Sequence, residues 1–163
     1  MLNIVLVEPE IPPNTGNIIR LCANTGAQLH LVEPLGFPLE DARMRRAGLD
    51  YHEYAEMKVH KSWEDFMQSE SPSPQNMYAL TTKGSTNYAS VAFKKNDYLI
   101  FGSETKGLRQ EVRDCFLQNH AIKLPMRPDN RSLNLSNTVA IVVYEAWRQM
   151  DFRSEEHTSE LQS

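Results

Sequence analysis

Short apolar runs along the chain alternate with stretches whose apolar residues recur at helical spacing. The runs are rich in β-branched and aromatic residues, as buried strands are. In residues 14–25 the apolar positions Ile18, Leu21 and Cys22 fall on one side of a helix. The pattern predicts strands at residues 4–7, 29–32, 57–60, 77–81, 98–101 and 120–124, and helices at residues 14–25, 40–47, 63–68, 108–117 and 135–150.

This alternation is typical of an α/β protein with a mostly parallel sheet and helices on both faces. Gly26 and Gly48 stand where two of the helices should end, and Ser62 stands where another should begin. The loop before the first helix is stiffened by prolines, and Asn14 or Thr15 would cap that helix. The pattern contains no internal repeat and no sign of a second domain.

The composition is that of an ordinary globular domain. The chain has 163 residues, 40% hydrophobic and 23% charged, and we expect one domain over residues 1–152. Residues 153–163 resemble a translated sequencing-library adapter, so we expect a non-native, disordered tail there. No apolar run approaches the roughly 18 residues that span a bilayer, and we expect no membrane partner.

Cysteine and histidine usage narrows the chemistry. Cys22 and Cys115 are the only cysteines and form no C-x-x-C pair, which favours a reducing cytoplasm. The five histidines have no metal-ligand spacing with cysteine or with one another, so we expect no metal site. A net charge of −4 argues against a surface coated with positive charge, although local basic clusters remain possible binding patches or plain solvated faces.

Polar residues gather at three places where a ligand could bind. Arg20 shares one helix face with two asparagines, either to grip phosphate or ribose oxygens or simply to face solvent. The strand at residues 98–101 ends in Gly102, and a loop leads on to Gly107, either at a ligand site or as plain turns. Hydroxyl and amide groups at residues 132–137 precede the last helix, as ligand contacts or as helix caps.

Two nucleotide-binding classes are not supported. The spacing of Gly102 and Gly107 is close to that of a P-loop, but Leu108 and Arg109 stand where Lys-Ser/Thr is required. No G-x-G-x-x-G follows a predicted strand, which disfavours ordinary dinucleotide binding. Sequence alone also shows no convincing Ser-His-Asp or Cys-His arrangement.

The last helix is apolar almost all round, through Val139, Ile141, Val143, Tyr144 and Trp147. A helix of that kind must be covered on every side. A second copy of the chain would cover it in a homodimer. Burial within one subunit is the alternative.

Taken together and in order, three segments resemble the three motifs of the SPOUT RNA methyltransferases. They are NTGNIIR at residues 14–20, FGSETKGL at 101–108 and LPMRPDNRSLNLSN at 124–137. Further strings are similar to the small single-domain branch, the TrmL (YibK-type) tRNA (cytidine/uridine-34)-2′-O-methyltransferases: RRAGLDYH at 45–52, ALTTKG at 79–84 and VYEAWR at 143–148. The resemblance extends from Met1 to about Phe152, and it is specific in combination rather than motif by motif.

The resemblance implies a deep trefoil knot at the C-terminal end, which general topology rules disfavour. It implies S-adenosylmethionine as the methyl donor, no metal, and an obligate homodimer. Arg20 is the implied catalytic residue, supported by Ser132 and Asn134. The implied donor contacts are Leu80, Gly102, Glu104, Gly107, Leu124, Met126, Ser132 and Leu133.

The implied substrate is the ribose 2′-hydroxyl of the wobble nucleotide, C34 or U34, in the anticodon loop of leucine tRNAs. Only RNA carries that hydroxyl. The expected RNA contacts are Arg43, Arg45, Arg46, Lys83, Arg127 and Tyr144, the last of which would otherwise pack in the core. Two alternatives stay open: a non-catalytic knotted RNA-binding or assembly protein, and a nucleotide-binding metabolic enzyme.

Overall fold

The computed structural model describes residues 1–40, 56–129 and 133–153. The predicted helix at residues 40–47 lies almost wholly outside them, as does the tail beyond Arg153. The described helices and strands are β1 (Asn3–Val7), α1 (Pro12–Thr25), β2 (Gln28–Val32), β3 (Lys58–His60), α4 (Trp63–Glu70), β4 (Met77–Leu80), β5 (Thr86–Asn87), β6 (Tyr98–Phe101), α5 (Gln110–Arg113), β7 (Ala121–Lys123) and α6 (Leu135–Gln149), with short 3-10 turns at Pro74–Asn76, Tyr88–Ser90 and Gln118–His120.

The strands form one sheet in the order β3-β2-β1-β6-β4-β7-β5, and every pairing between neighbours is parallel. β1 lies in the interior with β2 on one side and β6 on the other. Because all strands run the same way, the loops that follow β1, β4, β6 and β7 emerge at one edge. The predicted parallel α/β architecture is confirmed.

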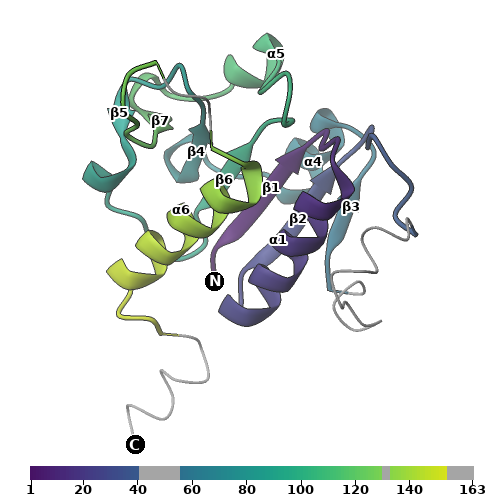
Figure 1. Cartoon of the computed structure of the whole chain (residues 1–163), viewed down its shortest axis with the longest axis horizontal. Coiled ribbons are helices and arrows are strands. Elements are labelled where there is room, and N and C mark those ends of the chain that lie inside the picture. The colour runs from purple at the N-terminus through teal and green to yellow at the C-terminus, as the bar shows by residue number, and fades with distance from the viewer. Residues whose placement is uncertain (41–55, 130–132, 154–163) are drawn as a thin grey trace, which may run out of the picture.

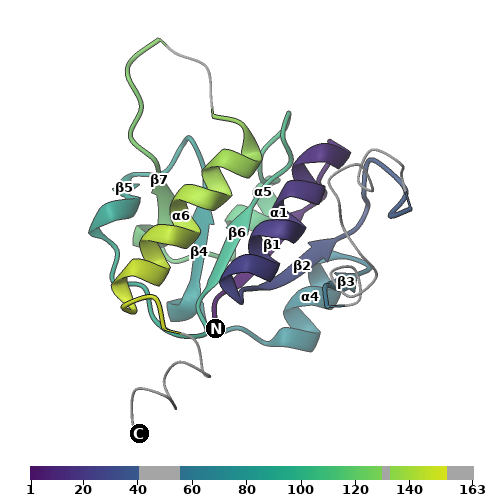
Figure 2. The same cartoon turned by 60° about the horizontal axis from the view of Figure 1, so that its bottom comes forward.

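Helices cover both faces of the sheet, α1 and α6 on one and α4 and α5 on the other (Figures 1 and 2). The side chains of β1 show why. Ile4 and Leu6 point into the cluster that contains the buried residues of α1 and α6, whereas Val5 and Val7 point into the cluster below α4 and α5. A strand buried on both faces is apolar throughout rather than alternating, as its sequence is.

The helix ends follow local chemistry, with one correction. Ser62 caps α4 by accepting a hydrogen bond from the Asp65 N–H at 3.0 Å, and Gly26 ends α1 at φ 79°, as predicted. The predicted cap of α1 was wrong. The helix begins at Pro12, a favoured first position, and its N-cap Ile11 has no side-chain cap, so Asn14 lies inside the first turn.

Two elements differ from the sequence pattern. The predicted helix at residues 108–117 is reduced to α5, because Arg109 and Leu117 both have extended backbone, at ψ 155° and 154°. β5 was not predicted, because a two-residue polar strand at the sheet edge has no hydrophobic pattern and exists only through its pairing with β7.

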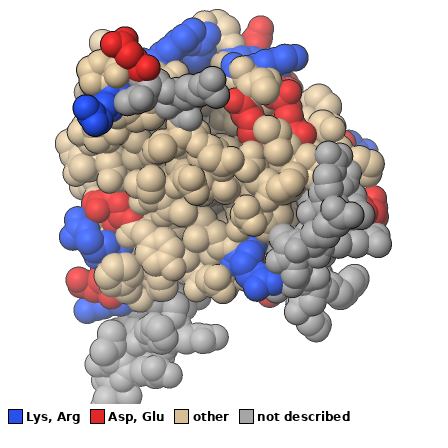
Figure 3. Space-filling view, viewed as in Figure 1, with Lys and Arg blue, Asp and Glu red and all other residues tan. Residues whose placement is uncertain are grey.

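The last helix buries one stripe rather than its whole circumference. Val139, Val142, Val143 and Ala146 are buried in α6, while Ile141 and Tyr144 are 39% and 45% exposed. α6 packs beside α1, and Figure 3 shows that the joint face of the two helices is largely uncharged, with charged side chains gathered at its margins. Within the part of the chain that the structure describes, none of the helices combines the length and hydrophobicity needed to cross a bilayer.

Candidate active site

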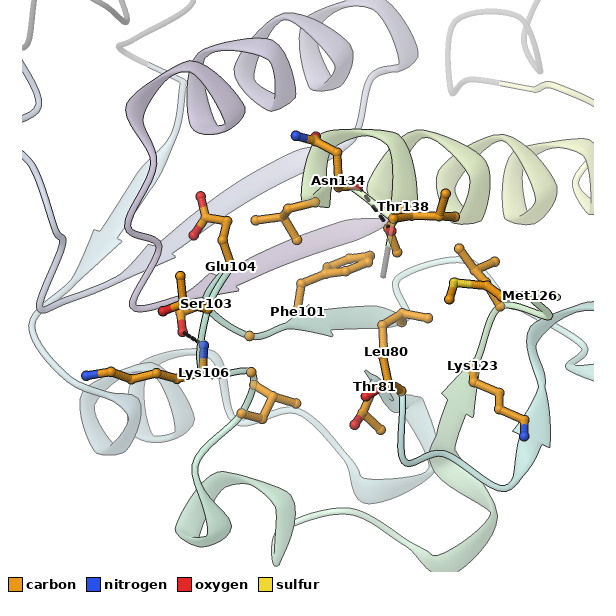
Figure 4. Close-up of a pocket in the computed structure, with 18 of the residues that line it drawn as sticks. Leu80, Thr81, Phe101, Ser103, Glu104, Lys106, Lys123, Met126, Asn134 and Thr138 are labelled. Carbon is orange, nitrogen blue, oxygen red and sulfur yellow. Dashed lines mark hydrogen bonds between the residues drawn. The ribbon is translucent and has the colours of Figure 1, made fainter. Parts of the chain in front are cut away.

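A pocket of about 930 Å³ opens at the edge of the sheet where the parallel strands end. Its walls are the loops that follow β4, β6 and β7, together with the start of α6 and two residues of the segment after β1 (Figure 4). Ligands of open α/β sheets bind at this edge. The pocket therefore lies where the fold class places a ligand.

The structure brings together the predicted donor contacts. All of those within the described residues line this pocket, although four different segments contribute them. Ser132 lies outside the described residues. The lining members of the predicted set are Leu80, Gly102, Glu104, Gly107, Leu124, Met126 and Leu133.

Position 102 needs a glycine because the backbone of residues 107–108 passes too close for a side chain. A Cβ on Gly102 would lie 2.2 Å from the carbonyl carbon of Gly107 and 2.4 Å from the nitrogen of Leu108. The turn is closed by Ser103 N–H donating to the Gly107 oxygen at 3.3 Å and Gly107 N–H donating to the Ser103 oxygen at 3.0 Å. Gly107 itself has φ 68°, the left-handed conformation that glycine adopts without strain. Both glycines thus shape the pocket wall.

The carboxylate of Glu104 supplies the N-terminal cap that α1 lacks locally. It accepts hydrogen bonds from the N–H groups of Glu10 at 2.8 Å and Ile11 at 2.9 Å, and from the side-chain amide of Asn14 at 3.2 Å. A negative charge at this end of a helix also complements the helix dipole. The loop after β6 and the start of α1 are therefore fixed to each other.

Asn134 opens α6 at the opposite wall of the pocket. Its Oδ1 accepts hydrogen bonds from the N–H of Ser136 at 2.9 Å and from the Ser136 hydroxyl at 2.6 Å. Its carbonyl oxygen accepts from the Thr138 hydroxyl at 3.2 Å, and both Asn134 and Thr138 line the pocket. The predicted helix cap is confirmed, and it lies at the same position as the predicted site residue.

Arg20 lies in the middle of α1, half-buried, and is not among the residues that line the pocket. Its helix packs beside α6 on the largely uncharged face. The implied catalytic residue thus lies on α1, a helix whose first turn lines the pocket, but within one chain Arg20 itself does not reach the cavity.

The predicted RNA contacts are distributed unevenly. Arg127 lines the pocket, and Lys83 is exposed immediately after the lining residue Thr82. Tyr144 is exposed on α6, where its ring packs edge-to-face on Trp147 at a centroid distance of 5.7 Å. Arg43, Arg45 and Arg46 lie outside the described residues.

Sequence reasoning missed two cations that line the pocket, Lys106 and Lys123. They reach outward on opposite sides of it (Figure 4). One signal was present for each: Lys106 precedes the loop glycine Gly107, and Lys123 ends a predicted strand. A polyanion such as RNA would meet a positive charge on either side of the pocket mouth.

A second polar cluster lies away from the pocket, in the layer between the sheet and α4. His30 and His60 are buried on neighbouring strands, and together with Glu70 they bring possible metal-ligand atoms within 4.8 Å of one another. Sequence spacing gave no sign of this cluster, because it depends on the pairing of β2 with β3.

The two histidines of that cluster find hydrogen-bond partners within the protein, without an ion. Asn3 Nδ2 donates to the Asn96 oxygen at 3.5 Å, which turns Asn3 Oδ1 toward His30 Nε2 at 3.0 Å. His30 therefore carries its proton on Nε2 and accepts at Nδ1 from His60 Nε2–H, also at 3.0 Å. The remaining His60 nitrogen lies 3.4 Å from the Ser69 hydroxyl. Both rings are satisfied as neutral imidazoles.

The titration behaviour agrees with this arrangement. Burial lowers the pKa of His30 to about 4, against partial opposition from the Glu70 carboxylate. Burial also lowers the pKa of His60. Burial, followed by its hydrogen bond to Glu70, raises the pKa of Tyr98 to about 12, so that its hydroxyl remains a donor to that carboxylate at 3.0 Å.

Fold and pocket together define a parallel α/β protein with a candidate ligand pocket at the strand ends, formed by glycine-containing and proline-containing loops. The chain belongs to the SpoU rRNA Methylase family, whose model matches residues 1–144. The resemblance inferred from the three motifs is confirmed by this match.

Relatives of known name cover almost the whole chain. The tRNA (cytidine(34)-2′-O)-methyltransferase of Burkholderia cenocepacia (strain HI2424) is 65% identical over 152 residues, which is 93% of this chain and 97% of that protein. The enzyme of the same name from Escherichia coli (strain K12) is 55% identical over 152 residues, 93% of this chain and 96% of that protein.

Solved structures agree in fold. A structure concerned with 2-OH methylation of C/U34 on tRNA has a TM-score of 0.82 and 39% identity, covering 94% of this chain and 98% of that one. The SpoU methyltransferase AviRb from Streptomyces viridochromogenes, in complex with AdoMet, has a TM-score of 0.77 at 22% identity, covering 93% of this chain and 58% of that one. The second likeness bears on the fold alone.

Proposed function

We propose that this chain transfers a methyl group from S-adenosylmethionine to the ribose 2′-hydroxyl of the wobble nucleotide, C34 or U34, of tRNA, with leucine tRNAs as its substrates. The observation that carries the proposal is the 65% identity, over nearly the full length of both proteins, to a tRNA (cytidine(34)-2′-O)-methyltransferase. The pocket at the strand ends supports it, because residues from all three motifs that suggested the family line one cavity.

The residues present fit the donor. A pocket of about 930 Å³ is large enough for a nucleoside-sized ligand. Its apolar side chains Leu80, Phe101 and Leu124 suit an adenine ring, and at Gly102 and Gly107 no side chain separates the backbone from the cavity. We assign the donor to Leu80, Gly102, Glu104, Gly107, Leu124, Met126, Ser132 and Leu133.

S-adenosylmethionine supplies a methyl group on a positively charged sulfur, so the reaction needs alignment and a path for one proton. Arg20 acts as a guanidinium cation that stabilises developing alkoxide charge or holds the adjacent phosphate. Asn134 orients rather than accepts the proton, because its Oδ1 already accepts two hydrogen bonds from Ser136. Ser132 or a water molecule takes the proton.

RNA binding is assigned to Arg43, Arg45, Arg46, Lys83, Arg127 and Tyr144, and we add Lys106 and Lys123 beside the pocket mouth. Cations that contact phosphates make affinity strongly salt-dependent. With tRNA as its substrate, the chain would act in the cytoplasm, where tRNA is modified.

We also propose a homodimer that buries the face formed by α1 and α6. Exposed Ile141 and Tyr144 on α6, and the largely uncharged face that α1 and α6 form, support this interface. The C-terminal deep trefoil knot is proposed from the family resemblance and is supported by the path from β7, near one edge of the sheet, back to α6 beside α1. The functional domain is proposed to be residues 1–152, with residues 153–163 a non-native tail.

The test is methyl transfer from labelled S-adenosylmethionine to unmodified leucine tRNA, compared with the same tRNA carrying 2′-deoxyribose at position 34. Incorporation into the first and none into the second is expected. Equal incorporation would place the methyl group elsewhere, and none into either, with tRNA still bound, would favour the non-catalytic RNA-binding alternative.

The part played by Arg20 is tested with Arg20→Lys and Arg20→Ala in the same assay. If the planar guanidinium is needed to hold a phosphate or the alkoxide, both variants lose most of their turnover, and Lys does not restore it. Full restoration by Lys would show that a positive charge alone suffices.

A further inference from the structure

Two loop segments form one wall of the pocket. Residues 8–14 follow β1 and residues 103–109 follow β6, and β1 and β6 are parallel neighbours in the sheet. Ile11 and Asn14 of the first segment and Ser103 through Leu108 of the second line the pocket. The relative position of the two segments therefore sets the width of the site on this side.

Each of the two segments supplies a carboxylate that accepts hydrogen bonds from the other. Glu104 of the second segment accepts hydrogen bonds from the backbone N–H groups of Glu10 and Ile11 in the first. Glu10 returns the contact: its Oε1 accepts from the N–H of Thr105 at 3.2 Å and from the Thr105 hydroxyl at 2.6 Å. Each acidic side chain thus binds the backbone of the opposite segment.

We propose that Glu10 is a positioning residue for the methyl donor: its carboxylate holds Thr105, so that the turn at residues 103–107 keeps the shape that the donor requires. The proposal rests on the proposed function, because it takes the pocket to be the donor site. Glu10 does not itself line the pocket, so it acts through the turn and not by contact.

The backbone of Glu10 is fixed from the other side, which makes it a firm anchor. Gly36 N–H donates to the Pro9 oxygen at 2.9 Å, and a Cβ on Gly36 would lie 2.9 Å from the Cα of Glu10. The loop after β2 therefore packs directly on the residue that holds Thr105. Because Glu10 is fixed, the turn at residues 103–107 can move only relative to it, and the hydrogen bonds from Thr105 to the Glu10 carboxylate restrain that movement.

The charge state of Glu10 and its hydrogen bonds agree with a role in positioning the turn. The hydrogen bonds from Thr105, side chain and then backbone, lower the pKa of Glu10, so it stays ionised and acts only as an acceptor. The third acidic group at this edge, Glu8, is likewise engaged, since Arg109 Nε donates to its two oxygens at 3.0 and 3.1 Å. Glu8, Glu10 and Glu104, the three carboxylates of these two segments, thus each have a structural partner beside a site for an anionic substrate.

The experiment measures S-adenosylmethionine affinity by calorimetry, and then KM and kcat with tRNA, for Glu10→Ala, Glu10→Gln, Thr105→Val and the double variant Glu10→Ala/Thr105→Val. Glu10→Ala is expected to weaken donor binding about five- to tenfold, the range of one lost hydrogen bond, with kcat at saturating donor and KM for tRNA unchanged. Glu10→Gln should keep wild-type affinity for the donor, because the glutamine amide oxygen can accept hydrogen bonds from both the N–H and the hydroxyl of Thr105. The double variant should be no weaker than Glu10→Ala alone.

A matched control is Glu56→Ala, which removes an exposed carboxylate outside the pocket. Three results would each overturn the proposal: wild-type donor affinity in Glu10→Ala, additive losses of affinity in the double variant, or reduced affinity in Glu10→Gln. If Glu10→Ala does not fold, Thr105→Val, at an exposed position, keeps the proposal testable. A wild-type chain that binds the donor but methylates no tRNA would remove the proposed function and leave the binding comparison to decide the role of Glu10. A wild type that does not bind the donor would remove both.

Discussion

The side-chain amide of Asn14 donates a hydrogen bond to the carboxylate of Glu104 across 90 residues of sequence, at 3.2 Å. One residue lies in the first turn of the helix that carries Arg20, and the other lies in the turn that forms the pocket wall. The contact joins two of the three motifs that suggested the family. It pairs an asparagine and a glutamate of two motifs that are far apart in the sequence.

Glu104→Ala should destabilise the protein and impair the site together. The substitution leaves the N–H groups of Glu10 and Ile11 without their acceptor at the start of α1, a change that costs about 1–2 kcal/mol when a helix cap is lost. Urea denaturation measures the loss in unfolding free energy. Glu56→Ala, at an exposed carboxylate outside the pocket, is the control, and an equal loss in both variants would contradict the capping role.

Gly102→Ala should abolish donor binding, whereas Gly107→Ala should weaken the fold and donor binding only mildly. A methyl group on Gly102 would lie 2.2 Å from the backbone of Gly107, and such overpacking costs about 1–3 kcal/mol or more. Gly107 has open space for a Cβ, so its substitution carries only the strain of a left-handed backbone, about 1–2 kcal/mol. Donor affinity in Gly102→Ala equal to that in Gly107→Ala would show that the close approach does not shape the pocket.

Much of the fold was predictable from the sequence, because each buried strand is an apolar run and the two long helices carry periodic stripes. The limits of α5 were not predictable, since Arg109 has extended backbone and pairs with Glu8, 101 residues away in the sequence. β5 exists only through pairing with β7. These features depend on strand order, which local periodicity does not contain.

The candidate site was predictable only as a set of residues. Its motif positions were named from family resemblance, and the structure brings the described donor contacts into one cavity but leaves Arg20 outside it. The partners of Glu104 and the cations Lys106 and Lys123 were missed, because sequence does not show which strand ends lie side by side. The same reason hid the pairing of His30 with His60.

Ile141→Asp should convert the proposed dimer into a monomer. Ile141 is 39% exposed on α6, and the face that α1 and α6 form is largely uncharged, so that a carboxylate buried there in a dimer would lack a partner. Leu117→Asp is the matched control, at a residue 42% exposed beyond α5, on the opposite side of the sheet. Light scattering after gel filtration gives the mass, and a dimer that persists in Ile141→Asp would contradict the interface.

Zinc should not stabilise the protein. His30, His60 and Glu70 have ligand atoms close enough for an ion, but the imidazole nitrogens already hold one another, Asn3 and Ser69 through a closed set of hydrogen bonds. Thermal unfolding with added Zn²⁺ and with EDTA should therefore give the same midpoint. A rise with Zn²⁺ that disappears in His60→Gln would show instead that the pair is a metal site.

Stability should fall as the pH drops from about 6.5 toward 4, because of the buried histidines. The pKa of His30 is lowered from 6.5 to about 4, so the unfolded chain binds a proton in this window that the folded chain does not. The stability present above pH 6.5 is lost progressively on acidification, by up to about 3 kcal/mol for a shift of this size. The lowered pKa values of His60 and Glu70 add to the loss in the same direction.

His30→Gln isolates this contribution. The glutamine amide can accept from His60 and donate to Asn3, as the neutral imidazole does, but it does not titrate. Unfolding free energies from urea denaturation at a series of pH values should therefore show a shallower slope between pH 6.5 and 4 in His30→Gln than in the wild type, with similar stability at neutral pH. Parallel slopes would mean that His30 is not held neutral, and a large loss at neutral pH would mean that the assigned pattern of donors and acceptors is wrong.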